Sequence, residues 1–189
     1  MRIGVDIDGV VCDSYPSWLG ELNRHYGKEI KELHSYEMHL LFEVPYEDMN
    51  NFFVENVEHL FTVPQPMPGV KKALEIIRRE HQVYLVTARR PEEEEITRKW
   101  LVAHEIPFDE LMMVGDRRKW DVCKEHKLEM FIEDYAGNAI GIAQAGLPVI
   151  IFDAPYNRDQ LPDGIKRCYN WGQVLQRIKE LQFSTGLKP

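Results

Sequence analysis

The feature that most constrains the fold is a regular alternation of short apolar segments with longer amphipathic segments beyond residue 67. Runs rich in Val, Ile and Leu have the length of a strand, and each is followed by a segment with apolar residues every three or four positions. We expect strands at 82–89, 109–116, 128–134 and 147–152, and helices at 70–79, 91–104, 119–125, 138–145 and 172–181. Strands joined by helices pair in parallel and are covered on both faces. The pattern therefore predicts an α/β fold with a doubly wound parallel sheet.

The chain begins with one more strand-like segment, MRIGVDIDGVVCD. Ile3, Val5 and Ile7 alternate with smaller or polar residues, which is the period of a strand, and a glycine then breaks the pattern. Asp6 and Asp8 are therefore expected on one face. Two neighbouring carboxylates repel each other unless a cation lies between them or one of them is protonated. The segment thus predicts a strand end that carries chemistry.

A stretch of different character separates this strand from the regular alternation. Residues 14–26 have the pattern of a helix that ends at Gly27. Between residues 28 and 61 short helical pieces mix with aromatic and acidic residues, and the proline-rich VPQPMPGV then marks a boundary. We therefore expect an α/β domain formed by residues 1–13 and 67–189, with a small helical domain of residues 14–66 inserted after the first strand.

Composition excludes several classes of protein. The 189 residues suit one domain that buries about 70% of its unfolded surface. No apolar run approaches the roughly 20 residues of a membrane span, and Met1 leads directly into the first strand, so we expect a cytoplasmic protein without a membrane partner. Cys12, Cys123 and Cys168 are too widely spaced to indicate a disulfide framework or a zinc site. A net charge of −8 disfavours polymeric nucleic acid as a partner but allows a small phosphorylated ligand.

Polar residues lie at the ends of the predicted strands, where parallel sheets form their ligand crevice. The sets are Asp6 and Asp8 at the end of the first strand, Thr87, Ala88 and Arg89 at the end of the second, and Glu133 and Asp134, with Asn138 further on, at the end of the fourth. Lys119 follows the third strand. Carboxylates without a sulfur ligand suit Mg²⁺, which prefers phosphate-bearing substrates. The strand ends together predict a site that binds a phosphoryl group.

Each of these residues also has an ordinary structural interpretation. An acid at a strand end commonly caps a helix or stabilises a turn. Thr87 can be a strand-end hydroxyl, Lys119 a solvated helix charge, and Arg89 and Arg90 a basic surface pair. Glu133 can add charge or orient a neighbour. The functional interpretation therefore depends on the residues occurring together.

Four motifs in this order resemble those of the haloacid dehalogenase superfamily, namely DIDGVV, LVTAR, Lys119 and IEDYAGN. The chain is most similar to the 5′(3′)-deoxyribonucleotidases and the bacterial nucleotidases related to them, over segments that include GLPVIIFDAPYNR and RCYNW. The resemblance implies a Rossmann-like core with the helical insertion as a cap. It also implies that Asp6 is the nucleophile, that Asp8 is the general acid and base, and that Thr87 and Lys119 bind the phosphate.

The same resemblance implies a cofactor and further contacts. Mg²⁺ would be bound by Asp6, Asp8 and Asp134, and the substrate phosphate would also contact Gly9 and Ala88. The chain departs from many relatives in its fourth motif, where Glu133 and Asn138 replace aspartates. Whether either assists the metal is left open. Lys119 is preferred over Lys124 as the phosphate lysine because its spacing from IED resembles that of the bacterial relatives.

The implied function is a Mg²⁺-dependent 5′(3′)-nucleotidase that dephosphorylates nucleoside monophosphates through an aspartyl-phosphate. The alternatives are a phosphatase for another small phosphomonoester and a non-catalytic phosphate-sensing module. A homodimer is left open. Among the aromatic residues of the insertion, Tyr15, Trp18, Tyr36, Phe42 and Tyr46 either stack on a base or form the insertion's own core, and the sequence assigns none of them to binding.

Overall fold

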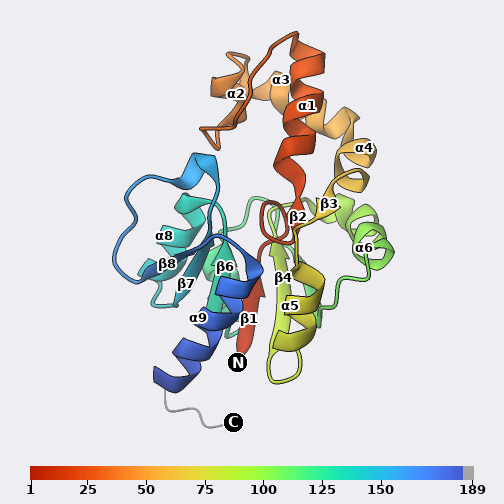
Figure 1. Ribbon diagram of the computed structural model, residues 1–189. Coiled ribbons are helices and arrows are strands. Elements are labelled where there is room, and N and C mark those ends of the chain that lie inside the picture. Colours follow the sequence, from red (N-terminus) through yellow and green to blue (C-terminus); the bar gives the residue numbers. More distant parts are fainter. Residues whose placement is uncertain (185–189) are drawn as a thin grey trace.

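The computed structural model describes residues 1–184, with side chains through residue 182. Within these residues a six-stranded parallel sheet has the order β5-β4-β1-β6-β7-β8 (Figure 1). The strands are β1 (Arg2–Val5), β4 (Gln82–Thr87), β5 (Glu110–Met113), β6 (Met130–Glu133), β7 (Val149–Phe152) and β8 (Ile165–Cys168). The order places β1 between β4 and β6, so three of the predicted strand ends with polar residues are neighbours. The predicted α/β fold is confirmed.

Helices cover both faces of the sheet. α5 (Val70–Ile77), α6 (Glu94–Ala103) and α9 (Trp171–Ser184) contribute to one buried cluster, and α7 (Lys119–Glu125) and α8 (Ala136–Gln144) to the other. Successive strand residues alternate between the two clusters, as Phe131 and Ile132 of β6 do. This alternation explains why the strands read as continuous apolar runs, since both faces of a doubly wound sheet are buried.

The helical insertion has a core of its own. It contains α1 (Ser14–Tyr26), α2 (Met38–Leu41), α3 (Tyr46–Glu55) and α4 (Val57–Thr62), which surround a separate apolar cluster. α1 ends at Gly27 in a left-handed conformation, φ 63°, as the sequence predicts. A short antiparallel pair, β2 (Cys12–Asp13) with β3 (Gln65–Pro66), joins the insertion to the sheet domain. In Figure 1 the insertion lies beyond the carboxyl ends of the strands.

Two parts of the sheet differ from the sequence prediction. β8 was not predicted, because its sequence is Ile-Lys-Arg-Cys and gives only a weak apolar pattern. It lies at an edge of the sheet, where a strand needs fewer apolar residues. β1 ends at Val5 rather than at Gly9. After it the chain turns back, and the Ile7 carbonyl accepts hydrogen bonds from the N–H groups of Val11 and Cys12, both at 2.8 Å. This turn changes the direction of Asp8.

In the part of the chain that the structure describes, no helix is long and apolar enough to cross a bilayer. Cys12, Cys123 and Cys168 are buried thiols, and over the same residues none forms a disulfide.

Candidate active site

Asp6 lies at the centre of the sheet, directly after β1. Its N–H donates to the Ile132 carbonyl of β6 at 2.9 Å, which continues the ladder and holds the residue in place. The Lys119 ammonium lies 2.7 Å from Asp6 Oδ2 and 3.0 Å from Glu133 Oε2. Lys119 is buried, whereas Lys124 is exposed on the same helix. The structure therefore brings Lys119, and not Lys124, to the predicted site.

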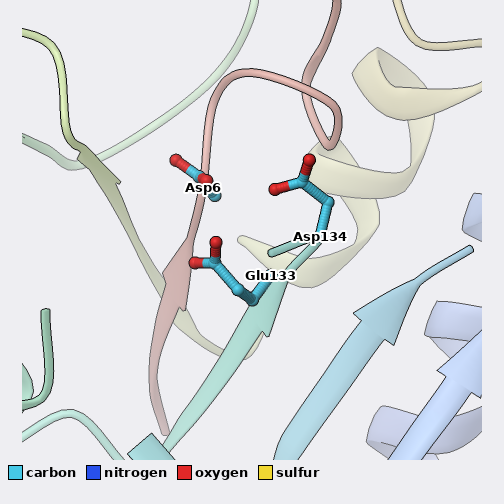
Figure 2. A group of neighbouring side chains, drawn as sticks. All are labelled: Asp6, Glu133 and Asp134. Atoms are coloured by element: carbon cyan, nitrogen blue, oxygen red, sulfur yellow. The ribbon is translucent and has the colours of Figure 1, made fainter. Parts of the chain in front are cut away.

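Three carboxyl groups from neighbouring strand ends meet beside Lys119. Figure 2 shows Asp6, Glu133 and Asp134 facing one another, and one oxygen from each lies within 4.8 Å of the other two. Burial and the Glu133 charge raise the pKa of Asp6 to about 8, and burial and the Asp6 charge raise the pKa of Asp134 to about 8. Without a further cation, the three carboxyl groups therefore resist being ionised together, even with Lys119 beside them.

The donor set fits a hard divalent cation. All three groups offer carboxylate oxygens, the ligands that Mg²⁺ prefers. Asp134 Oδ1 is buried and has no hydrogen-bond partner among the described residues, which is costly unless another ligand satisfies it. Glu133 belongs to the cluster, and Asn138 instead donates to Glu133 Oε1 at 3.3 Å. Of the two residues that the sequence left open, Glu133 therefore lies in the cluster and Asn138 lies beside it.

Asp8 does not point into this cluster. Its carboxylate accepts a bidentate pair of hydrogen bonds from Arg89, at 2.8 Å from Nε and 2.7 Å from Nη2, and a further bond from the Ser14 hydroxyl. The prediction that Asp6 and Asp8 share one face is wrong, because β1 ends before the turn between them. The predicted repulsion is relieved by two separate cations, Lys119 for Asp6 and Arg89 for Asp8.

Arg89 is the site residue that sequence reasoning undervalued. Its interpretation as half of a basic surface pair is wrong, since its side chain is 2% exposed. The guanidinium carbon lies 3.9 Å from the Phe61 ring centroid of α4, and Nη1 donates to the Thr97 hydroxyl of α6 at 3.1 Å. Its position in the sequence could have indicated a role in the site. Arg89 comes just after the buried strand β4, at the sheet edge where Asp6 and Asp8 also lie.

Thr87 and Ala88 lie at the carboxyl end of β4, and Gly9 packs against Asp134. Thr87 ends β4 and is buried, with its hydroxyl accepting the Arg89 N–H at 3.2 Å, while Ala88 is exposed beside it. Gly9 has φ 78°, and a Cβ there would lie 2.2 Å from Asp134 Oδ2. Only glycine fits at this position, because any side chain would displace the Asp134 carboxylate.

A cavity of about 330 Å³ extends from Asp6, Thr87 and Ala88 to the helical insertion. On the sheet side it is lined by residues that include Asp6, Asp8, Thr87, Ala88, Arg89 and Asp116, and on the insertion side by Tyr15, Trp18, Tyr36, Met38, Tyr46, Asn50, Phe53 and Phe61. Phe42 is fully buried in the core of the insertion instead. Of the other aromatic residues named from the sequence, Tyr15, Tyr36 and Tyr46 line the cavity, and Trp18 belongs both to the cavity lining and to the core of the insertion. The volume lies in the range of small-molecule sites.

The fold defines the class of protein. A haloacid dehalogenase-like hydrolase from Streptococcus pneumoniae superposes with a TM-score of 0.68 at 16% identity, over 94% of this chain and 97% of that one. A haloacid dehalogenase-superfamily hydrolase from Geobacter sulfurreducens gives a TM-score of 0.60 at 16% identity, over 94% and 95%. The chain therefore has the α/β fold of these hydrolases.

The sequence comparison is more specific. Residues 1–183 match the family described as 5′ nucleotidase, deoxy (pyrimidine), cytosolic type C protein, and the chain belongs to this family. A nucleotidase of Clostridium acetobutylicum is 31% identical over 183 residues, which cover 96% of this chain and 95% of its own length. The protein is thus an enzyme, a phosphoric monoester hydrolase of the nucleotidase type.

Proposed function

We propose that the protein is a Mg²⁺-dependent 5′(3′)-nucleotidase that hydrolyses nucleoside monophosphates through an aspartyl-phosphate on Asp6. The proposal rests on one observation, that the two ends of the cavity described above differ in chemistry. One end is lined by several carboxylates, among them Asp6, and by the Thr87 hydroxyl and the guanidinium groups of Arg89 and Arg90. With a divalent cation bound, these groups suit a phosphate. The other end is lined by aromatic rings and Asn50, which suit a planar base with polar edges.

Asp6 is the proposed nucleophile. An Asp6 oxygen forms a bond to phosphorus as the bond from phosphorus to the nucleoside oxygen breaks, which divides one difficult hydrolysis into two displacements. Lys119 lies 2.7 Å from the Asp6 carboxylate, where its ammonium offsets charge on the attacking carboxylate and the phosphate. Thr87 and the chain at Gly9 and Ala88 complete the proposed phosphate contacts.

Asp8 is proposed to move the protons. A carboxylate has about four acceptor positions. Among the described residues, Arg89 donates one hydrogen bond to each Asp8 oxygen, and Ser14 donates a second one to Oδ1. One acceptor position therefore stays open at Oδ2, where a proton can bind. Asp8 gives that proton to the departing nucleoside oxygen, and it then takes one from the water that attacks phosphorus. The second displacement releases inorganic phosphate and restores the Asp6 carboxylate.

Asp6, Glu133 and Asp134 are proposed to hold Mg²⁺. Asp8, which the sequence analysis also named as a metal ligand, is left out of this set because Arg89 binds both of its carboxylate oxygens. When bound, Mg²⁺ supplies positive charge that stabilises the phosphoryl oxygens. We further propose that residues 14–66 act as the cap that selects the substrate, since they contribute the aromatic side of the cavity.

A phosphate-release panel tests the proposed substrate. Deoxyribonucleotides, ribonucleotides, sugar phosphates and phosphoamino acids are compared at matched concentrations. The best nucleotide is expected to exceed the best sugar phosphate in kcat/KM by at least about tenfold, because stacking one base is worth roughly 1–3 kcal/mol. A sugar phosphate or phosphoamino acid as the best substrate rejects the nucleotidase proposal and leaves the aspartyl-phosphate chemistry to be judged separately.

A further inference from the structure

The two oxygens of Asp134 have different surroundings. Oδ2 accepts a hydrogen bond from the Tyr156 hydroxyl. Oδ1 is buried and has no partner among residues 1–184. One oxygen of Asp134 lies within 4.8 Å of ligand atoms of Asp6 and Glu133. Tyr156 therefore binds one oxygen of the Asp134 carboxylate, and the other oxygen stays available to a different ligand.

The segment that carries Tyr156 is fastened to the same strand end. η2 (Pro155–Asn157) is a single turn after β7. The buried Asn157 amide donates to the Asp134 carbonyl at 2.6 Å and to the Phe152 carbonyl at 2.8 Å. Arg167 of β8 in turn donates to the Asn157 carbonyl at 2.7 Å. The turn is thus anchored to β6, β7 and β8, and its position does not depend on the hydroxyl of Tyr156.

Aromatic contacts fix the ring of Tyr156. Its centroid lies 4.8 Å from that of Tyr15 in α1 and 5.9 Å from that of Tyr36 in the insertion. The Asp134 carboxylate packs against the chain at Gly9, where an added Cβ would lie 2.2 Å from Oδ2. The ring and the carboxylate are thus each packed against neighbouring parts of the chain. The contact is therefore a built feature of the fold and not a chance surface pair.

Building on the proposed metal site, we propose that Tyr156 is a positioning residue for Asp134. Its hydroxyl holds Oδ2 and so leaves the buried, unpartnered Oδ1 as the oxygen that would bind a divalent cation together with Asp6 and Glu133. Ligating carboxylates are commonly oriented by such outer hydrogen bonds, and the loss of one typically weakens metal affinity by about 10–100-fold. The same ring touches the insertion through Tyr36, so one residue links the cap to the metal end of the site.

The test is a direct measurement of metal binding. MgCl₂ is titrated by calorimetry into the metal-free full-length protein, and Mn²⁺ binding is followed by electron paramagnetic resonance. Tyr156→Phe keeps the ring contacts and removes only the hydroxyl, and it is expected to weaken both affinities by about 10–100-fold. Tyr169→Phe is the matched control, because Tyr169 is 63% exposed, and it is expected to stay within about twofold of the wild type.

The outcomes separate the two proposals. A wild-type protein that binds neither cation removes the metal from the proposed function, and this inference with it. A wild-type protein that binds, together with a Tyr156→Phe variant within about twofold of it or tighter, overturns the positioning role alone. The rise in melting temperature that MgCl₂ produces is a second measure that also works for a destabilised variant. An equal rise in wild type and Tyr156→Phe overturns the role as well.

Discussion

Replacing Arg89 by methionine is expected to destabilise the folded protein by about 3–5 kcal/mol, because it leaves the Asp8 carboxylate largely buried without its cation. The side chains of Arg89 and Asp8 are 2% and 14% exposed, so water cannot take the place of the guanidinium at both oxygens. Ser14 still donates to Asp8, which places the loss toward the lower end of this range. For a chain of 189 residues, each kcal/mol corresponds to about 2–4 °C, so the melting temperature falls by roughly 6–20 °C.

Calorimetric melting at pH 7 in EDTA measures this effect without a contribution from bound metal. Arg98→Met is the matched control, because Arg98 pairs with Glu94 at a surface where the two side chains are 47% and 46% exposed. Such a pair contributes at most about 1 kcal/mol, so its loss lowers the melting temperature by less than about 4 °C.

A double variant tests whether the cause is the unpaired charge. Arg89→Met combined with Asp8→Asn removes both charges, and at least half of the lost stability is expected to return, because the amide costs far less to bury than a carboxylate. An Arg89→Met variant that melts within about 2 °C of the wild type refutes the reasoning. A double variant no more stable than the single one refutes it also.

Further predictions concern catalysis and pH. Asp6→Asn should abolish phosphoenzyme in rapid-quench experiments, while Asp8→Asn should accumulate it from p-nitrophenyl phosphate, because the amide cannot activate water; normal turnover of Asp6→Asn would contradict the assigned nucleophile. EDTA should stop hydrolysis and Mg²⁺ should restore it, and equal rates in chelator would argue against the metal. Tyr46→Ala should lower kcat/KM for nucleotides by about 5–100-fold and leave acetyl phosphate within about twofold, since Tyr46 is 68% exposed at the cavity. Hydrogen bonds from Arg78 lower the pKa of Asp109 below its ordinary 3.8, so the pair stabilises the protein above that pH and the contribution is lost as pH falls through the lowered pKa. Urea titrations should therefore show Asp109→Asn less stable at pH 7, with the difference from wild type shrinking below about pH 4, and a constant difference would be contrary to this.

Local patterns were enough to predict most of the fold. The helix at Ser14–Tyr26 and the one at Lys119–Glu125 match the predicted ranges, because capping residues and apolar spacing act within a few positions of the chain. The strands that contribute to both buried clusters were also found, since burial on two faces requires unbroken apolar runs. β8 was missed because a short edge strand needs few apolar residues.

Motif spacing likewise predicted which residues reach the site. Asp6, Thr87, Lys119 and Asp134 each lie at or just beyond the end of a predicted strand, and the ends of parallel strands meet at one edge of the sheet. Their detailed roles stay proposals. The spacing of motifs does not predict which charged residues pair with each other, because this depends on strand order and on the turns between strands.

Tertiary structure alone decided those partners. Asp8 and Arg89 are 81 positions apart, and they meet because β4 lies beside β1 and because the turn after Asp6 redirects the next acid. Tyr156 reaches Asp134 only because β7 pairs with β6 and Asn157 anchors the intervening turn. A sequence records burial and local propensity residue by residue, whereas the pairing of charged groups depends on distances in space that arise only when the sheet is assembled.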